Sequence, residues 1–75
     1  MDELKLFLAA SGVQFTTYGD FISSRQDLPN HRQWLVSGTC NVLYVYTLDC
    51  GEYRCGFWGI DFRQIADKVL EIENR

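Results

Sequence analysis

The chain has 75 residues and a formal net charge of −3, and its seven lysines and arginines form no cluster, so the basic footprint of a nucleic-acid-binding protein is missing. Apolar residues make up 47% of the sequence and aromatic residues 15%, which predicts one folded domain over residues 1–75. No stretch reaches the roughly 20 apolar residues of a membrane span, and the first residues lack the positive charge of a signal peptide. With an odd cysteine count as well, we expect a cytoplasmic protein that does not contact membranes.

The first expected element is a short amphipathic helix. Leu4, Phe7 and Leu8 recur at the spacing of one helical face. Asp2 is the candidate N-cap, and Gly12 is typical of the residue that ends a helix. A helix this short must pack on another element to be stable.

The next part of the chain predicts strand and then loop. Residues 13–18 alternate and are rich in β-branched and aromatic side chains, which is typical of a strand, and the glycine that follows would turn the chain. Two interpretations stay open for residues 21–22, a second short strand or the start of a helical turn. Residues 23–31 are polar and hold the only proline, so we expect a loop there.

Residues 32–58 predict a meander of three antiparallel strands joined by two tight turns. Cys50 and Gly51 form the second turn if it is a two-residue loop, and that choice sets which residues face each other. One face then pairs Leu48 with Tyr53, Tyr46 with Cys55 and Tyr44 with Phe57, and the other pairs Thr47 with Arg54, Val45 with Gly56 and Leu43 with Trp58. The first turn, residues 38–41, is uncertain by one residue, which leaves the faces of Trp34 and Leu35 open.

A second amphipathic helix is predicted directly after the meander. Asp61 is its N-cap, Gln64 three residues later completes a capping box, and Ile60 is placed to contact Ile65 as a hydrophobic staple. Leu70 lies at the flank of the apolar stripe that follows. The stripe consists of Phe62, Ile65, Ala66, Val69 and Ile72.

Together these elements predict an α+β fold, a small antiparallel sheet of three to five strands flanked by an N-terminal and a C-terminal helix. A buried tyrosine hydroxyl needs a hydrogen-bond partner, so the face richer in tyrosine is the more costly one to cover. We therefore expect the helices to pack on Leu43, Val45 and Trp58. The other face, left open, would carry Tyr44, Tyr46, Tyr53 and Phe57.

One histidine and three cysteines invite a test for a zinc site: His31, Cys40, Cys50 and Cys55. Cys40 and Cys50 are expected in turns at opposite ends of one strand, more than about 20 Å apart at roughly 3.3 Å per residue. That distance excludes a shared metal and a disulfide between them. No nucleophile-elbow, phosphate-loop or metalloprotease motif occurs either, so we expect no enzyme, no metal and no cofactor.

Protein binding is the function that these exclusions favour. The candidate binding residues are the aromatic set Tyr44, Tyr46, Tyr53 and Phe57 and the acidic pair at the second turn, Asp49 and Glu52. In size and charge the chain is similar to the small inhibitor proteins that phages make against host or defence machinery, anti-CRISPR proteins included, an analogy of class that no motif carries. The expected partner is therefore a larger protein or protein complex, which the chain would inhibit or modulate.

Other partners stay open as alternatives. A homodimer is one, because small domains often gain stability by association. Another is a module that binds single-stranded nucleic acid or a small ligand by stacking on the aromatic face, although the missing basic groove makes nucleic acid an unexpected partner. Residues 32–37 or 53–58 could also accept a strand from another chain if either lies at an edge of the sheet, with Arg32 and Arg54 as guards against that.

Overall fold

The computed structural model describes residues 1–39 and 41–75, so the predictions about Cys40, including its distance from Cys50, lie outside the described residues. Two α-helices, five strands and a 3-10 helix are present in these residues. In chain order they are α1 (Asp2–Ala10), β1 (Phe15–Thr17), β2 (Phe21–Ser24), η1 (Asn30–Arg32), β3 (Trp34–Gly38), β4 (Leu43–Asp49), β5 (Glu52–Gly59) and α2 (Phe62–Glu73).

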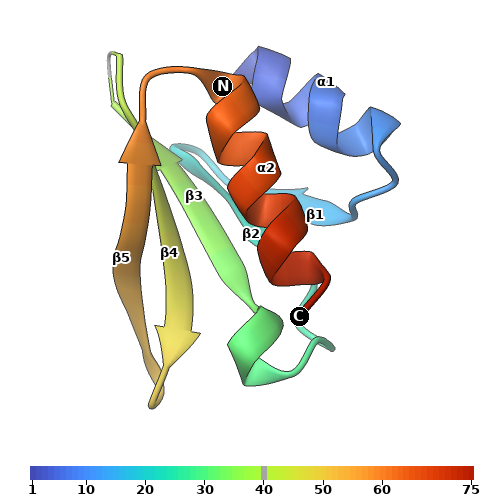
Figure 1. Ribbon diagram of the computed structural model, residues 1–75, viewed down its shortest axis with the longest axis vertical. Coiled ribbons are helices and arrows are strands. Elements are labelled where there is room, and N and C mark those ends of the chain that lie inside the picture. The colour runs from blue at the N-terminus through green and yellow to red at the C-terminus, as the bar shows by residue number, and fades with distance from the viewer. Residues whose placement is uncertain (40) are drawn as a thin grey trace.

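The strands form one antiparallel sheet whose spatial order, β1-β2-β3-β4-β5, is also the order in the sequence. Both helices lie on the same side of this sheet (Figure 1). The α+β fold with two flanking helices is therefore confirmed, and the sheet has the largest number of strands that the sequence allowed. β1 and β5 are its two edge strands, and β3 lies in the interior.

The N-terminal helix is confirmed, but its cap is not the predicted one. The N-cap position belongs to Met1, which makes no side-chain cap hydrogen bond, and Asp2 is already helical. The carboxylate of Asp2 still lies in the first turn, where its negative charge interacts favourably with the positive end of the helix dipole. Gly12 has φ +81°, so the chain leaves the helix through a left-handed residue as glycine permits.

Residues 21–24 form a second strand, which decides between the two interpretations of this segment. The predicted loop at residues 23–31 is wrong at its start, because Ser23 and Ser24 continue β2 and are buried. The Ser24 hydroxyl oxygen accepts a hydrogen bond from the Trp34 backbone N–H at 3.1 Å. A short polar side chain can therefore be buried here because its polar atom has a partner.

The predicted turn between β4 and β5 is confirmed. Cys50 and Gly51 have φ values of +53° and +83°, as a two-residue type I′ hairpin turn requires. The register next to this turn is also as predicted. The confirmed pairs are Leu48 with Tyr53, Thr47 with Arg54 and Tyr46 with Cys55.

The register beyond these pairs differs from the prediction because β5 contains a bulge. Gly56 has no partner on β4, so Val45 pairs with Phe57 and Tyr44 pairs with Trp58. This single extra residue exchanges the two aromatic rings between the faces of the sheet. Phe57 packs against the core, and Trp58 is 64% exposed, so the predicted positions of both are wrong.

The core lies between the helices and one face of the sheet. Trp34 is fully buried there and pairs with Thr47, so Leu35 lies on the opposite face, which settles the faces of these two residues. Val45 is covered as predicted, and Leu43 is partly buried against the same core. The buried residues are Leu4, Leu8, Val13, Ile22, Trp34, Val36, Val45, Ile65, Ala66, Val69 and Ile72.

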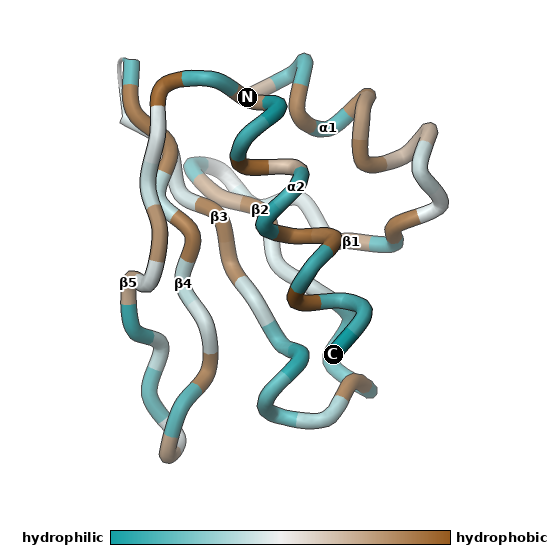
Figure 2. The backbone as a smooth tube through the Cα atoms, viewed as in Figure 1, coloured by the Kyte–Doolittle hydropathy of each residue, from teal (hydrophilic) through white to brown (hydrophobic). Residues whose placement is uncertain are grey.

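Helix α2 provides the largest part of the covering layer. Its predicted apolar stripe is confirmed, and hydrophobic and hydrophilic residues alternate along it at helical spacing in Figure 2. Asp61 is the N-cap, as predicted. The capping box with Gln64 is not formed, because Asp61 Oδ1 accepts from the Arg63 N–H at 2.9 Å and the Gln64 side chain lies against Gly59. Ile60 is 75% exposed, so the predicted staple onto Ile65 adds little.

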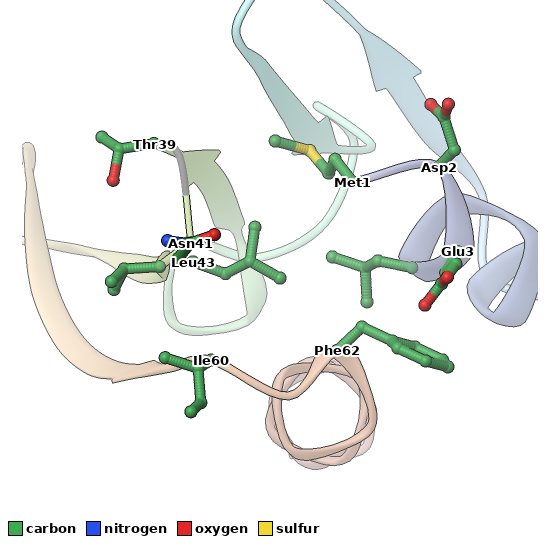
Figure 3. Close-up of a pocket in the computed structure, with 10 residues that line it drawn as sticks. Met1, Asp2, Glu3, Thr39, Asn41, Leu43, Ile60 and Phe62 are labelled. Carbon is green, nitrogen blue, oxygen red and sulfur yellow. The ribbon is translucent and has the colours of Figure 1, made fainter.

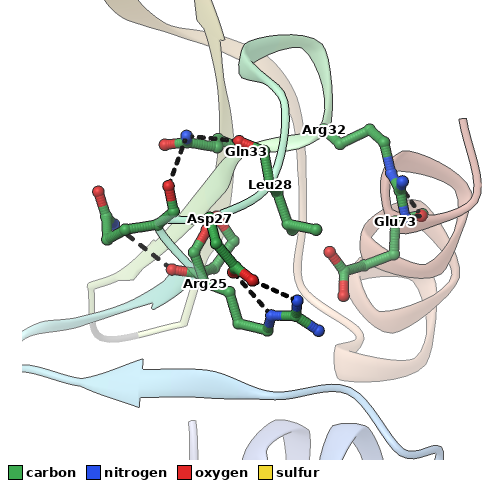
Figure 4. A network of polar contacts seen from close by, with 8 residues as sticks. Arg25, Asp27, Leu28, Arg32, Gln33 and Glu73 are labelled. Carbon is green, nitrogen blue, oxygen red and sulfur yellow. Dashed lines mark hydrogen bonds and ion pairs between the residues drawn. The ribbon is translucent and has the colours of Figure 1, made fainter.

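A polar network joins the segment before β3 to the end of α2 (Figure 4). Arg32 Nε donates to the Glu73 carbonyl at 2.9 Å, and Gln33 Nε2 donates to the Leu28 carbonyl at 2.9 Å. Arg25 and Asp27 form an ion pair beside them. The long connection from β2 to β3 is therefore fixed by side-chain bonds to backbone carbonyls.

Candidate interaction surface

The sheet face that the helices leave uncovered is the main candidate for a functional surface, and we call it the open face. Strand register assigns its residues, because alternate side chains of a strand point to opposite sides. They form cross-strand rows: Phe21, Ser37, Tyr44 and Trp58 in one; Thr16, Ser23, Leu35, Tyr46 and Cys55 in the next; and Leu48 with Tyr53 beside the β4–β5 turn.

Aromatic and aliphatic side chains dominate this surface. Trp58 and Tyr53 are its most accessible large members, 64% and 38% exposed. Tyr44 and Tyr46 are half-buried between their neighbours in the sheet. Tyr18 stacks on Phe21 with ring centroids 4.7 Å apart, which extends the aromatic row beyond the end of the sheet. The three predicted tyrosines thus lie on one face.

The open face carries no charged strand residue, although the chain as a whole is acidic. Three charged residues occur in the strands, and register places all of them on the helix side: Asp49, Glu52 and Arg54. The predicted acidic candidates Asp49 and Glu52 flank the β4–β5 turn and are not brought together with the tyrosines.

Sequence reasoning missed part of this surface. Trp58, Phe21 and Leu35 belong to the open face, whereas Phe57, a predicted member, does not. The signal that could have corrected this is Gly56, because an isolated glycine inside a strand often marks a bulge. A Cβ at that position would meet no atom within 4 Å, so the glycine is not there for close packing.

Cys50 lacks the surroundings that activate a nucleophile. Cys50 is exposed, and a hydrogen bond with Asp49, together with the charge of that carboxylate, raises the pKa of the thiol. A reactive cysteine needs the opposite shift. His31 is exposed in η1. Within residues 1–39 and 41–75, no three histidine, cysteine or acidic side chains lie close enough together to hold a metal ion.

A pocket of about 560 Å³ lies between the start of α1, the β3–β4 connection and the β5–α2 connection (Figure 3). Its apolar lining includes Leu4, Leu43 and Phe62, and Asp2 and Glu3 bring two carboxylates to its rim. Its described lining residues include no histidine, cysteine or lysine.

A second hollow, of about 520 Å³, lies between β5 and the flank of α2. We call it the edge groove, because β5 is the outermost strand of the sheet. Phe57 and Trp58 line it from the strand. Gln64, Asp67, Lys68 and Glu71 line it from the helix.

In comparisons with known proteins, no family model, curated protein or solved structure matches the chain. The helices in the described part of the chain are too short or too polar to cross a membrane. Any functional conclusion therefore depends on the geometry of the surfaces described above.

Proposed function

We propose that this protein is a non-enzymatic binding protein that occupies a surface of a larger protein and thereby modulates or inhibits it. The observation that carries the proposal is the open face, a sheet surface that is rich in aromatic side chains and has no charged strand residue on it. Tyrosine and tryptophan dominate binding hot spots because they bury a large area with few rotatable bonds. The matching partner surface is apolar and uncharged, since a buried unpaired charge would oppose binding.

The size of the open face indicates what kind of contact it supports. β3, β4 and β5 have 5, 7 and 8 residues, and at about 3.3 Å per residue and roughly 4.8 Å between strands they present on the order of 300 Å² in projection. That is comparable with the largest apolar patches of monomers, roughly 300–600 Å² and often functional. A standard interface buries about 800 Å² per partner, so a stable complex needs contacts beyond this face.

The proposal predicts that a charge placed on the open face abolishes capture of the partner. The experiment compares proteins retained from lysate by the wild-type chain and by Tyr53→Asp and Tyr46→Asp variants. Burying the new carboxylate would cost more than the lost ring alone, so we expect at least a tenfold loss of the retained partner.

Ile60→Asp is the matched control, because it makes the same kind of change at a residue that is 75% exposed and outside the strands. It should retain the partner as well as the wild type does, and circular dichroism should give all variants a folded spectrum. Retention of the same proteins by all four chains, or of none, would refute the proposal. A wild-type chain that is a dimer in solution, and a monomer with Tyr53→Asp, would show that the occupant is a second copy.

The alternative is a module that binds single-stranded nucleic acid or a small ligand through the same aromatic rows. The exposed Trp58 and Tyr53 side chains are suited to stacking on bases. The open face offers no lysine or arginine to the phosphates, which argues against it. An electrophoretic shift assay with single-stranded DNA at low salt should therefore show no retarded band, and a band that weakens steeply with salt would favour this alternative.

A further inference from the structure

β5 is an exposed edge strand. It has eight residues and pairs with β4 on one side only, so backbone N–H and C=O groups on its other side have no strand partner. The opposite edge, β1, has three residues. A long edge strand can accept an additional strand from another chain, and in β5 the regular parts on either side of the Gly56 bulge are available for this.

Helix α2 forms the wall of the edge groove that lies opposite β5. Gln64, Asp67 or Lys68, and Glu71 follow each other at helical spacing, so they form the flank of α2 that faces β5. Phe57 supplies an apolar floor, and Trp58 lies at the margin where the groove meets the open face. An extended segment in this position would contact backbone on one side and a helix on the other.

The helix wall has an unbalanced negative charge. Lys68 Nζ pairs with Glu71 at 3.3 Å, while Asp67 forms no ion pair within the described residues. Asp67 and Glu71 are also four residues apart on the helix, a spacing at which like charges repel. Because Lys68 already pairs with Glu71, Asp67 is the carboxylate that a cation from another chain would pair with.

We propose that the edge groove binds an extended, basic segment of the partner protein, which adds to β5 as a sixth strand. The segment places a lysine or arginine against Asp67 and an apolar side chain over Phe57. This inference rests on the proposed function and adds the contact area that the open face lacks. A second copy of the chain fits less well, because each copy has a net charge of −3 and β5 itself offers Glu52 at its start.

The probe for this proposal is a display library of random eight-residue peptides, selected on the immobilised protein. We expect the selected peptides to alternate in character and to contain lysine or arginine. Fluorescence polarisation with a selected peptide should show at least a tenfold weaker Kd for Asp67→Lys. Asp20→Lys makes the same charge change at the exposed β1–β2 turn and should leave the Kd unchanged. Selected peptides without basic residues, or equal Kd values for both variants, would overturn the proposal.

A backbone test separates strand addition from side-chain binding alone. Chains made by chemical ligation with one N-methyl amide at a time across residues 53–58 should lose peptide binding where the N–H points away from β4, and these positions alternate separately on each side of the Gly56 bulge. A uniform or absent effect would refute strand addition. Tyr46→Asp changes the open face on β4, one strand away from the edge, and should leave peptide affinity unchanged, so a failure here is distinguishable from a failure of the open face. A concentration-dependent dimer that Asp67→Lys leaves intact would identify a second copy as the occupant and overturn the proposal.

Discussion

Buried hydroxyls decide local structure at the start of the meander. Ser24 is 1% exposed, and its oxygen accepts the backbone N–H of Trp34 at a point where β2 and β3 have no further ladder pair. The same hydroxyl donates to the Arg25 carbonyl at 3.3 Å. One small side chain thus provides partners for two backbone groups next to the largest buried residue of the core.

We expect Ser24→Ala to lower the free energy of unfolding by about 1–3 kcal/mol, because the buried Trp34 N–H would lose its acceptor. Urea unfolding followed by tryptophan fluorescence measures this change. Ser37→Ala removes the same group from a half-buried position on the open face and should change stability by less than about 0.5 kcal/mol. Equal effects of the two substitutions would contradict the role given to Ser24.

Asp61 makes the start of α2 sensitive to acid. The hydrogen bond from the Arg63 N–H, with a smaller contribution from the Arg63 side chain, lowers the pKa of the Asp61 carboxyl below its ordinary value of 3.8. As the pH falls, the unfolded chain takes up this proton first, so the stabilisation is complete above the ordinary pKa and is lost as the pH falls through the folded-state value.

Asp61→Asn should therefore reduce the acid dependence of stability while keeping a side-chain acceptor at the N-cap. Thermal unfolding between pH 2 and 6 should show a difference in Tm from the wild type that is largest near pH 6 and disappears at the acid end. Asp61→Ala removes the cap altogether and should lower the Tm near pH 6 by about 4–8 °C. Parallel curves for the wild type and Asp61→Asn would contradict this account.

At the scale of elements, the C-terminal end of α2 depends on a side chain far away in the sequence. Arg32 donates through both Nε and Nη2 to the carbonyl of Glu73, one of the last carbonyls of the helix. A guanidinium at this end also complements the negative end of the helix dipole. The 3-10 helix η1 is thereby attached to the covering layer.

Arg32→Met keeps much of the apolar stem and removes both donors, so we expect a loss of about 1 kcal/mol in the free energy of unfolding. Chemical denaturation measures it, and hydrogen exchange should become faster at the last amides of α2. Arg54→Met is the control, because Arg54 is exposed and its nearest carboxylate, Glu52, is 4.0 Å away. An equal loss from both substitutions would show that the contact with Glu73 contributes nothing specific.

Elements with a strong local signal could be predicted from the sequence. The stripe of α2 follows from helical spacing and the Asp61 cap from the residue type. Gly51 indicates the β4–β5 turn because glycine readily takes a positive φ, whereas Cys50 carries no such signal. The bulge at Gly56 could not be placed in the same way, because an extra residue in a strand leaves the alternation of its neighbours intact on either side. The sequence does not distinguish β2 from a helical turn, because Ser23 and Ser24 are residue types typical of loops and their burial depends on hydrogen bonds that only the fold provides.

At the scale of the molecule, the sequence predicts which face of the sheet is uncovered better than it predicts the limits of that face. The uncovered tyrosine face was expected because buried hydroxyls need partners, and Tyr44, Tyr46 and Tyr53 do lie there. The predicted membership of this face is wrong after the bulge at Gly56, because Trp58 lies on the face in place of Phe57. The edge groove could not be foreseen in detail, because it is formed by β5 and a helix whose relative position depends on the packing of the whole core.

The unequal lengths of the two sheet edges limit how this protein can assemble. One edge has eight residues and the other only three, so pairing with β5 leaves a complex whose only free edge on this chain is short. Repeated head-to-tail addition of copies needs two edges of similar length, and here one edge is much shorter than the other. Growth by sheet extension therefore ends after a single step, which favours a discrete complex over a fibre.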